Sequence, residues 1–352
     1  MTDDPLRGRG SSFNPPNRFD RLHYEPDPEA VDPDEEAAPT TLVLRDASRS
    51  LISYNDSPDI GFDAAINPYR GCEHGCIYCY ARPYHEFLGF SAGLDFETKI
   101  LAKPDAAALL RAELNKKSWR PQVLAISGVT DCYQPIERHL KLTRQCLEVL
   151  TEFRNPVAII TKNRLVTRDI DLLGELARHG AAIVYLSLTT LDAELARVME
   201  PRASAPASRL AAIEELTAAG IPVGVMTAPV IPGLNDHELP ALVAAAAKAG
   251  ARHAGYTILR LPHSVVDLFE RWLTQHFPDR KERVLGRIRD LREGKLNEAE
   301  FGRRMRGTGP LAEMIRKMFE LACKQAGIQN GRPVLSTEAF RRPGAQPLLF
   351  DL

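Results

Sequence analysis

Residues 157–188, VAIITKNRLVTRDIDLLGELARHGAAIVYLSL, decide the fold of this 352-residue chain. Two apolar runs rich in β-branched residues, 157–160 and 183–188, flank a helical stretch that ends before Gly180. Strands that are apolar throughout are typical of a parallel sheet covered by helices on both faces. The stretch therefore predicts one strand–helix–strand unit whose two strands are parallel.

The same alternation continues through most of the chain. Further apolar runs occupy residues 64–69, 123–126, 222–227 and 254–259. Between 123 and 259, successive runs end 28 to 39 residues apart, close to the roughly 30 residues of one such unit. Six strands predict an α/β protein with a partial (βα)6 TIM-like barrel over residues 46–262, with the site at the carboxyl ends of the strands. A doubly wound open sheet is the alternative.

The segments outside the barrel differ in composition. Residues 1–45 are acidic and rich in proline, which predicts a largely disordered arm. Within it, RGRGSS at 7–12 is either a tail that contacts phosphate or an ordinary solvated terminus. Residues 263–329 read as a helical extension broken at Pro278 and at 307–310, and residues 330–352 as an extended tail.

The formal net charge of −1 hides an uneven distribution. Residues 1–60 carry six Arg and thirteen Asp or Glu (net −7), 61–259 are neutral, and 260–352 carry eighteen basic and twelve acidic residues (net +6). This balance excludes a uniformly basic nucleic-acid binder but leaves room for a local basic surface. The arginines between 287 and 306 are candidates for it, and a solvated helix face is the alternative, because acids interleave with them.

The chain shows no targeting or membrane segment. No apolar stretch follows its acidic start, and no run reaches the roughly 18 apolar residues of a membrane span. We therefore expect a cytoplasmic protein without a membrane partner. In that compartment six cysteines indicate metal binding or catalysis rather than disulfide bonds.

Three of the six cysteines lie within eight residues, in the segment NPYRGCEHGCIYCY at 67–80. Cys72, Cys76 and Cys79 follow the spacing C-x3-C-x2-C directly after the first predicted strand. Closely spaced thiolates suit a metal or cluster that prefers soft sulfur ligands, and Gly71 and Gly75 permit the tight loop that this requires. The main interpretation is a [4Fe–4S] cluster with three protein ligands and one open iron.

Two alternatives to the cluster stay open. A structural zinc site needs a fourth ligand, for which His74, His85 and Cys132 are candidates, but such sites usually have a second C-x2-C pair, which this chain lacks. Chance placement of buried thiols is the other alternative. Cys146 and Cys323 have apolar neighbours four residues away, so we expect both to pack in the core.

The cysteine spacing, with an aromatic residue before the third cysteine, resembles the signature of radical S-adenosylmethionine (SAM) enzymes. The resemblance extends through GVTDCYQPIE, ITKN, SLTTLD, MEPRASAPASRL and PVIPGLND to the spore photoproduct lyase-like branch, closest to an uncharacterised bacterial subgroup. It covers residues 60–330 and implies a partial (βα)6 barrel. It also implies that the open iron binds SAM, that one electron splits the sulfonium, and that the resulting 5′-deoxyadenosyl radical abstracts hydrogen from a substrate.

The same resemblance implies residue roles. The iron ligands are Cys72, Cys76 and Cys79. The implied SAM contacts are Tyr78, Val230 and Ile231 for the adenine, Gly128, Val129, Thr130 and Asp131 for the amino group, Lys162 for the carboxylate and Ser187 for the ribose. A structural cap at a strand end is the alternative for each of these contacts. Arg209 binds phosphate or closes the site, and the alternative is a salt bridge on a helix surface.

One departure from the lyases concerns the hydrogen donor. The lyases use an additional cysteine, whereas here Cys132 directly follows Asp131 and the register does not match cleanly. Tyr80, which follows the third cysteine, does resemble a tyrosine of the lyases. The departure argues against strict thymine-dimer reversal, and we expect Cys132 or Tyr80 to handle a substrate radical.

Three hypotheses about function follow: a radical enzyme of nucleic-acid repair or modification, a radical enzyme acting on a small molecule, peptide or protein, and a non-catalytic zinc-binding protein. A radical enzyme needs an external electron donor of the flavodoxin or ferredoxin type. The peptide QPLLF, from Gln346 to Phe350, resembles the segment by which bacterial DNA enzymes dock on the sliding clamp. Pro347 departs from the usual leucine, and packing of this end on the barrel is the alternative.

Overall fold

The computed structural model describes residues 5–20, 40–331 and 333–343. Its centre is an eight-stranded sheet in the order β11-β10-β9-β8-β7-β6-β3-β2. Six of its strands are parallel and lie in chain order: β3 (Ala64–Ile66), β6 (Leu124–Ile126), β7 (Val157–Thr161), β8 (Ala182–Ser187), β9 (Val223–Val230) and β10 (His253–Ile258). At the edges, β2 (Ile52–Tyr54) is antiparallel to β3, and β11 (Gln329–Asn330) is parallel to β10. This is the predicted partial (βα)6 barrel with one further strand at each edge.

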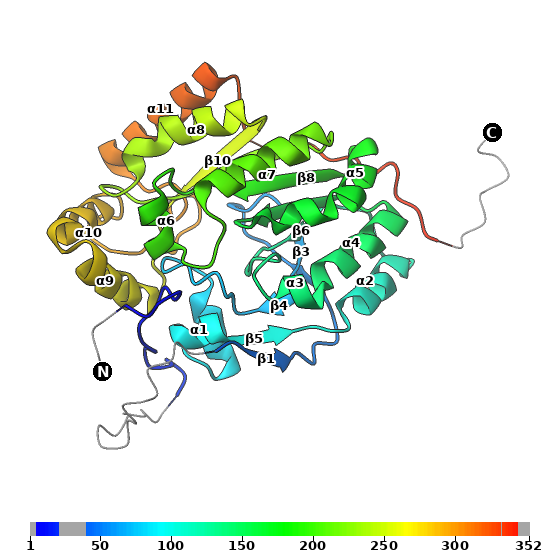
Figure 1. Cartoon of the computed structure of the whole chain (residues 1–352), viewed down its shortest axis with the longest axis horizontal. Helices are drawn as coiled ribbons and strands as arrows, with labels where there is room; N and C mark the ends of the chain where they lie inside the picture. Colours follow the sequence, from blue (N-terminus) through cyan, green and yellow to red (C-terminus); the bar gives the residue numbers. More distant parts are fainter. Residues whose placement is uncertain (1–4, 21–39, 332, 344–352) are drawn as a thin grey trace.

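The helices that connect the parallel strands cover the outside of the sheet (Figure 1). The longer ones are α2 (Ala106–Asn115), α4 (Leu142–Phe153), α5 (Ile170–Arg178), α7 (Pro206–Ala218) and α8 (Leu239–Lys248). The shorter ones are α3 (Glu137–Leu140), η2 (Arg164–Asp169), α6 (Ala193–Met199) and η3 (Asp236–Glu238). Apolar side chains of the longer helices and of the strands share one core. That shared core explains why the strands read as apolar throughout.

The predicted strand at 64–69 is divided in the structure. Its first half is β3, whereas Tyr69–Arg70 form β4 in a separate three-stranded sheet. There β4 is antiparallel to β5 (Lys99–Ala102), which is parallel to β1 (Leu42–Arg45). Pro68 interrupts the run because it has no amide hydrogen to donate to a neighbouring strand. Strand β4 of the small sheet therefore ends directly before the cysteine loop.

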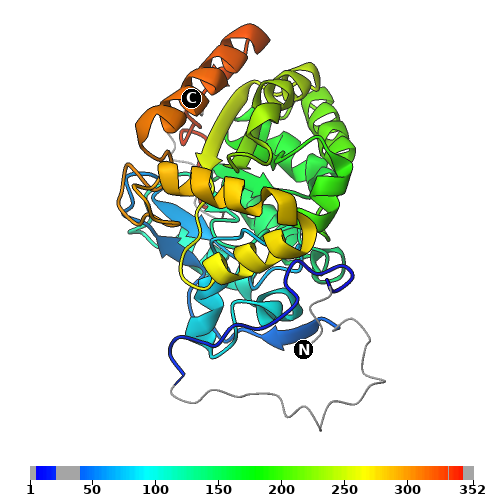
Figure 2. The same cartoon turned by 90° about the vertical axis from the view of Figure 1, so that its left-hand side faces the viewer.

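The chain after β10 is mainly helical. It forms α9 (Val265–His276), η4 (Pro278–Arg280), α10 (Lys281–Asp290) and α11 (Gly309–Ala326). The break at Pro278 falls where the sequence predicted it, whereas the second break extends over residues 291–308 and Gly309 already begins α11. Figure 2 shows α9 and α10 crossing one side of the molecule, and α11 lies along α8 (Figure 1).

The tail after β11 runs back along the barrel. The amide of Ser336 donates to the carbonyl of Gly180 (2.9 Å), and the amide of Arg341 donates to the carbonyl of Phe153 (2.9 Å). The clamp-like peptide at 346–350 lies outside the described residues. None of the helices in the described ranges is both long and apolar enough to cross a membrane.

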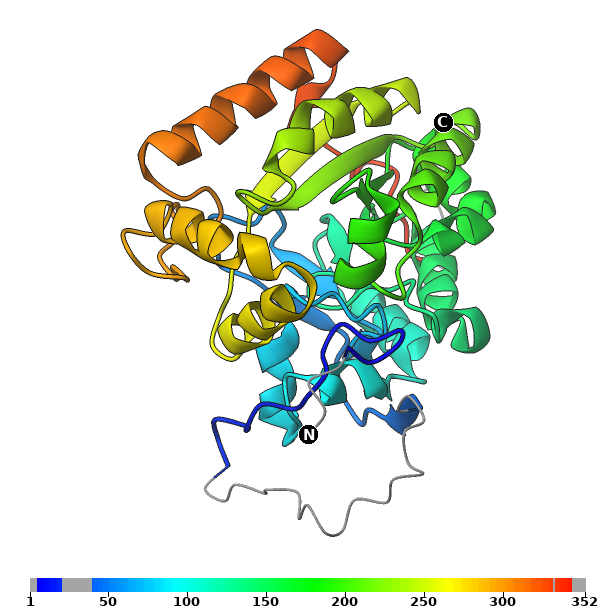
Figure 3. The same cartoon turned by 60° about the vertical axis from the view of Figure 1, so that its left-hand side comes forward.

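Parts of the N-terminal arm have a defined course. Residues 40–45 lead into and form β1, and residues 5–20 lie against η1 (Arg82–Leu88) and α1 (Leu94–Thr98), as Figure 3 shows. The arm is therefore ordered over both segments, and its other residues lie outside the described ranges. The acidic, proline-rich composition did not reveal this order, because the contacts are made with residues about 80 positions away.

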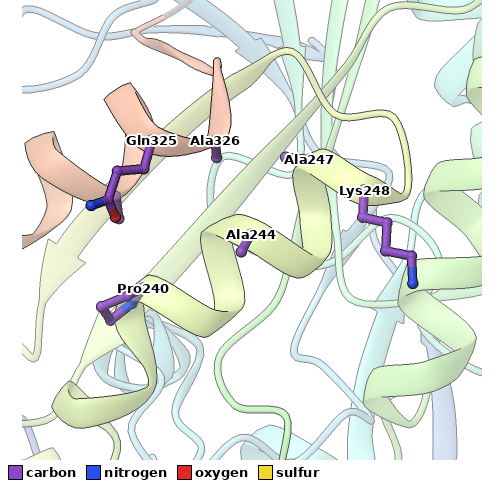
Figure 4. Close-up of a pocket in the computed structure, with 7 residues that line it drawn as sticks. Pro240, Ala244, Ala247, Lys248, Gln325 and Ala326 are labelled. Atoms are coloured by element: carbon purple, nitrogen blue, oxygen red, sulfur yellow. The ribbon is translucent and has the colours of Figure 1, made fainter.

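A shallow groove lies between α8 and α11 (Figure 4). Its lining residues are Pro240, Ala244, Ala247, Lys248, Ala322, Gln325 and Ala326. Lys248 is the only titratable side chain among them, so this groove lacks the carboxylates, imidazoles and thiols of a catalytic site. The candidate site lies instead at the carboxyl ends of the strands.

Candidate active site

The three clustered cysteines lie in one loop directly after β4. All three thiols are free; Cys72 and Cys76 are buried, and Cys79 is half-buried. The loop turns through Gly71 (φ 77°) and Gly75 (φ 67°), both in the left-handed region. An added Cβ at either glycine would come within 3.0 Å of a neighbouring oxygen atom. The loop conformation therefore requires glycine at both positions.

The thiols lie close enough to influence one another's ionisation. Burial, followed by the charges of Asp131 and of the other two thiols, raises the pKa of Cys72. Burial also raises the pKa of Cys76 and of Cys79. Buried thiolates that repel one another are unfavourable alone, and a bound cation that replaces their protons removes the repulsion. This set of soft donors therefore fits a metal cluster.

The geometry differs from that of a site for one metal ion. Within the described ranges, no three His, Cys, Asp or Glu side chains are arranged to hold an ion. The cysteines of a [4Fe–4S] cluster bind different iron atoms, so their sulfurs need not converge on one point. Of the candidate fourth zinc ligands, His74 Nε2 lies 3.2 Å from Asn163 Nδ2, and Cys132 lies in the main core. His85 packs edge-on against Phe96, and burial lowers its pKa to about 4.

The loop after β6 contacts the cysteine loop and the residues just before it. Each residue from 128 to 131 makes one of these contacts. The contacts are Tyr80 Oη to Gly128 O (2.7 Å), Val129 N to Asn67 Oδ1 (3.1 Å), Thr130 Oγ1 to Tyr69 O (2.9 Å) and His74 Nδ1 to Asp131 Oδ2 (3.3 Å). The structure thus brings the four predicted amino-group contacts, 128–131, against the cysteine loop.

The Asp131 carboxylate is already engaged inside the protein. It accepts hydrogen bonds from Thr161 Oγ1 (2.7 Å), the amide of Lys162 (2.8 Å) and the amide of Tyr133 (2.9 Å). Burial alone would raise its pKa, but His74 and these donors lower it to about 2. The ionised carboxylate therefore ties the end of β7 to the cysteine loop, whatever else it binds.

A buried ion pair supports the other side of the loop. Glu200 pairs with Arg209, and both side chains are at most 1% exposed. The carboxylate also accepts hydrogen bonds from the Tyr78 hydroxyl and from Thr189 Oγ1 (2.6 Å). Arg209 donates to the carbonyl of Ser187 at the end of β8 (2.9 Å). Arg209 is therefore neither a surface residue nor free to bind phosphate, because the fold buries it against Glu200.

Lys162 is the cation that the structure leaves available. Its Nζ lies 5.8 Å from the centroid of the Tyr78 ring, and its side chain is half-buried. Its charge acts on Cys76 and Glu200, since it opposes the effect of burial on the pKa of each. No carboxylate of the described residues lies within ion-pair distance of it, which suits a residue that holds the carboxylate of a ligand.

Other predicted SAM contacts are buried. Ser187 is 3% exposed, and Val230 and Ile231 at the end of β9 are 3% and 0% exposed. The amide of Ile231 donates to Asn235 Oδ1 (2.6 Å), which fixes the turn after β9. Ser187 ends β8, and Val230 and Ile231 lie at the end of β9, where both pack in the apolar core.

The two candidate radical-handling residues have different surroundings. Tyr80 is 41% exposed, and its ring faces the Arg260 guanidinium at 5.3 Å. Cys132 is 0% exposed, and its amide donates to Ser127 Oγ (2.8 Å) within the main core. Only Tyr80 is therefore placed to meet a substrate from solvent without a rearrangement of the fold.

Two of the arginines between 287 and 306 are engaged within the fold. Arg292 is buried and donates to the carbonyls of Leu259 (2.9 Å) and Arg303 (3.0 Å). Arg304 pairs with Asp59 at 2.6 Å. Arg292 and Arg304 therefore hold the chain after β10 against the rest of the molecule.

Sequence reasoning missed two groups of supporting residues. One is the buried pair of Arg82 and Glu97, and the other is the segment 9–11 that contacts it. Arg82 lies three residues after the last cluster cysteine, and an arginine so close to three thiols was the available signal. No comparable signal marks Glu97, which lies in a short helix of ordinary composition.

The comparisons with known proteins agree with this geometry. Residues 66–246 match the model of the radical SAM superfamily. The chain belongs to the radical SAM superfamily. Together with a lyase-like fold, membership makes it a radical SAM enzyme and sets aside the non-catalytic zinc-binding alternative.

Its relatives in this superfamily include proteins from distant organisms. An uncharacterised protein of Mycobacterium tuberculosis (strain ATCC 25618 / H37Rv) is 38% identical over 232 residues, which cover 65% of this chain and 67% of that protein. An uncharacterised protein of Methanocaldococcus jannaschii is 28% identical over 222 residues, covering 63% of this chain and 79% of that protein. A radical SAM Nα-GlyT isomerase of Pseudomonas phage M6 is 27% identical over 180 residues, covering 50% of this chain and 35% of the isomerase.

Solved structures of spore photoproduct lyase share the fold. A cysteine-to-serine mutant has a TM-score of 0.60 at 16% identity, covering 82% of this chain and 81% of the lyase. A double mutant with bound SAM and dinucleoside spore photoproduct has a TM-score of 0.60 at 17% identity, covering 82% and 80%. At this level of identity the likeness establishes the architecture, and the SAM in the second structure belongs to the lyase.

Proposed function

We propose that Cys72, Cys76 and Cys79 hold a [4Fe–4S] cluster whose open iron binds SAM. The observation that carries this is the single buried loop in which three free thiols share one environment at the carboxyl ends of the barrel strands. Such a cluster supplies reductive cleavage of SAM to a 5′-deoxyadenosyl radical that abstracts hydrogen from a substrate.

The chain's own residues have separable tasks in this proposal. Lys162 is free to pair with the SAM carboxylate, since no acid of the described residues occupies it. Asp131 holds the loop after β6 at the cysteines, because its carboxylate contacts His74 and accepts hydrogen bonds from Thr161 and the amide of Lys162. Tyr80 forms part of the exposed edge, between Cys79 and Arg260, where a substrate meets the site.

The test is anaerobic reconstitution of the full chain with iron and sulfide, followed by dithionite and SAM. We expect bound iron, the absorbance of a [4Fe–4S] cluster and formation of 5′-deoxyadenosine. Cys72→Ala, Cys76→Ala and Cys79→Ala should each lose all three. The matched control is Cys323→Ala, which removes a buried thiol from α11 and should keep them. Equal iron binding by all four variants would contradict the proposal.

We further propose that the substrate is a nucleic acid. Beyond Cys79 the chain exposes aromatic rings at Tyr80 (41%), Tyr84 (55%) and Phe87 (66%). The Arg18 guanidinium lies 5.5 Å from the Phe87 ring, and Arg260 lies over Tyr80. Exposed rings interleaved with arginines are typical of surfaces that stack on unpaired bases and contact phosphates. The fold neighbour that binds a dinucleoside photoproduct supports the same class of substrate.

A gel-shift series in increasing salt, with single-stranded and duplex oligonucleotides, tests this class of substrate. We expect affinity to fall with salt, and the combined Tyr84→Ala and Phe87→Ala substitution to weaken binding about tenfold or more, because stacking contributes ~1–3 kcal/mol per base. The control pair is Met314→Ala with Leu321→Ala, which removes two exposed apolar side chains from α11. Absence of salt-dependent binding would favour a small molecule, peptide or protein as substrate.

We propose two protein partners for this enzyme, an electron donor and the sliding clamp. A cytoplasmic radical SAM enzyme of this kind takes its electron from a flavodoxin or ferredoxin. Docking on the sliding clamp through 346–350 is tested by a clamp pull-down with and without residues 346–352. Equal capture of both forms would exclude the peptide as the docking segment.

A further inference from the structure

The N-terminal segment contacts the support of the cysteine loop directly. We call residues 9–18 the N-terminal strap. The amides of Gly10 and Ser11 donate to the two carboxylate oxygens of Glu97, at 3.0 and 2.9 Å. These contacts join residues almost 90 positions apart in the chain. The RGRGSS stretch is therefore packed on the protein at Gly10 and Ser11 rather than solvated throughout.

Glu97 in turn holds the residue that shapes the cysteine loop. Its carboxylate pairs with Arg82 at 2.5 Å, and both side chains are 0% exposed. Arg82 donates to the carbonyls of Gly75 (3.2 Å) and Cys76 (3.0 Å), which are part of the loop itself. The chain of contacts thus runs from the strap through one carboxylate and one guanidinium to the backbone between two cluster cysteines.

The strap also touches the loop without any intermediary. An added Cβ at Gly10 would lie 1.7 Å from the carbonyl oxygen of Gly75. An added Cβ at Gly93 would lie 2.0 Å from the carbonyl oxygen of Phe13, further along the strap. Neither contact leaves room for a methyl group, so the strap is in van der Waals contact with the cysteine loop at Gly75 and with the start of α1 at Gly93.

Further contacts anchor the strap on both of its sides. Toward α1, Ser91 Oγ donates to the carbonyl of Pro15 (2.6 Å), and Asn17 Nδ2 donates to the carbonyl of Glu86 (2.9 Å). Toward α9, the Arg271 guanidinium lies 4.5 Å from the centroid of the Phe13 ring. The strap is therefore sandwiched between α9 and the segment that follows the cysteines, where Figure 3 shows its dark-blue trace.

We propose that the N-terminal strap is a structural part of the cluster site. It excludes water from the Arg82–Glu97 pair and so fixes the loop carbonyls, which keeps the three cysteines in the arrangement that retains a cluster. Residues outside the ligand shell commonly control metal retention in this way. The inference rests on the proposed [4Fe–4S] cluster. It assigns Gly10, Arg82 and Glu97 as positioning residues rather than catalytic ones.

The test compares two glycine-to-alanine variants of the full chain. Gly10→Ala places a methyl group against the loop carbonyl, whereas Gly174→Ala adds the same group on α5, where nothing lies within 4 Å. After anaerobic reconstitution, iron loss to a chelator is followed by the fall in cluster absorbance. We expect Gly10→Ala to lose iron about tenfold faster than the wild-type chain. Gly174→Ala should lose iron at the wild-type rate.

A second readout does not depend on the loaded cluster. Amide hydrogen exchange of residues 70–80 in the metal-free protein should become faster in Gly10→Ala and stay unchanged in Gly174→Ala. A variant lacking residues 1–12 should behave as Gly10→Ala in both measurements. Iron loss from the truncated chain at the wild-type rate would overturn the inference. Failure of the wild-type chain itself to bind iron would instead count against the proposed function.

Discussion

Two buried ion pairs support the cysteine loop, and they differ in how the chain completes them. Arg82–Glu97 lies on the side of the N-terminal strap, and Arg209–Glu200 lies on the side of β8. The second pair joins residues nine positions apart and is completed by side-chain hydroxyls of Tyr78 and Thr189. The first is completed by backbone amides from almost 90 residues away. The loop is therefore held by one pair that side-chain hydroxyls complete and by another that backbone amides of the docked N-terminal strap complete.

The largest expected effect comes from removing the cation of either pair. Arg82→Ala and Arg209→Ala each leave a carboxylate buried without its partner, so we expect the free energy of unfolding to fall by about 3–5 kcal/mol. Urea denaturation of the metal-free protein measures this. The control is Arg316→Ala, whose exposed pairs with Glu313 and Glu320 should contribute less than about 1 kcal/mol. Equal effects of Arg82→Ala and Arg316→Ala would contradict a structural role for the Arg82 pair.

A second prediction separates the two supports by the kind of donor they use. Tyr78→Phe removes one hydroxyl from Glu200 and should cost about 1.5–3 kcal/mol of unfolding free energy, the usual range for hydrogen bonds to charged groups. No side-chain deletion can do the same at Glu97, since Gly10 and Ser11 donate through their backbone amides. Phe87→Leu, at an exposed ring, is the control and should be nearly neutral in the same urea titration.

The difference between the supports also explains what could be read from the sequence. The six βα units and the site at the strand ends were predictable, because each strand repeats an apolar pattern at a regular spacing. Cys72, Cys76 and Cys79 were predictable as a group because their spacing is local. The burial of Arg209 was not, since its helix carries enough polar residues to look like a surface helix.

The N-terminal strap was the hardest part to predict. Its composition is polar and proline-rich, and nothing in it repeats with a helical or strand period. Its order depends on single contacts, such as that of Gly10 with Gly75, that are visible only when the two segments lie together. The tight fit of a glycine against a distant glycine leaves no periodic signal in either segment.

A third prediction concerns Lys162, which has no carboxylate partner among the described residues. Lys162→Met should raise the KM for SAM about tenfold, because a charged hydrogen bond of ~1.5–3 kcal/mol is lost. It should change the unfolding free energy much less than Arg82→Ala or Arg209→Ala, since no ion pair is broken. The measurement is the SAM dependence of 5′-deoxyadenosine formation. An unchanged KM would show that Lys162 does not contact SAM and is a solvated side chain instead.

The smallest expected effect tests how the strap is held. Asn14 Nδ2 donates to Asp95 Oδ1 (3.1 Å) in a contact that is open to solvent. Asn14→Ala should therefore lower the unfolding free energy by only about 0.5–1.5 kcal/mol. It should leave iron loss at the wild-type rate, in contrast to Gly10→Ala. If Asn14→Ala released iron as fast as Gly10→Ala, the strap would act through its attachment as a whole. Retention of iron by Asn14→Ala would place the effect at the buried contacts with Glu97 and Gly75, where the distant support meets the cysteine loop.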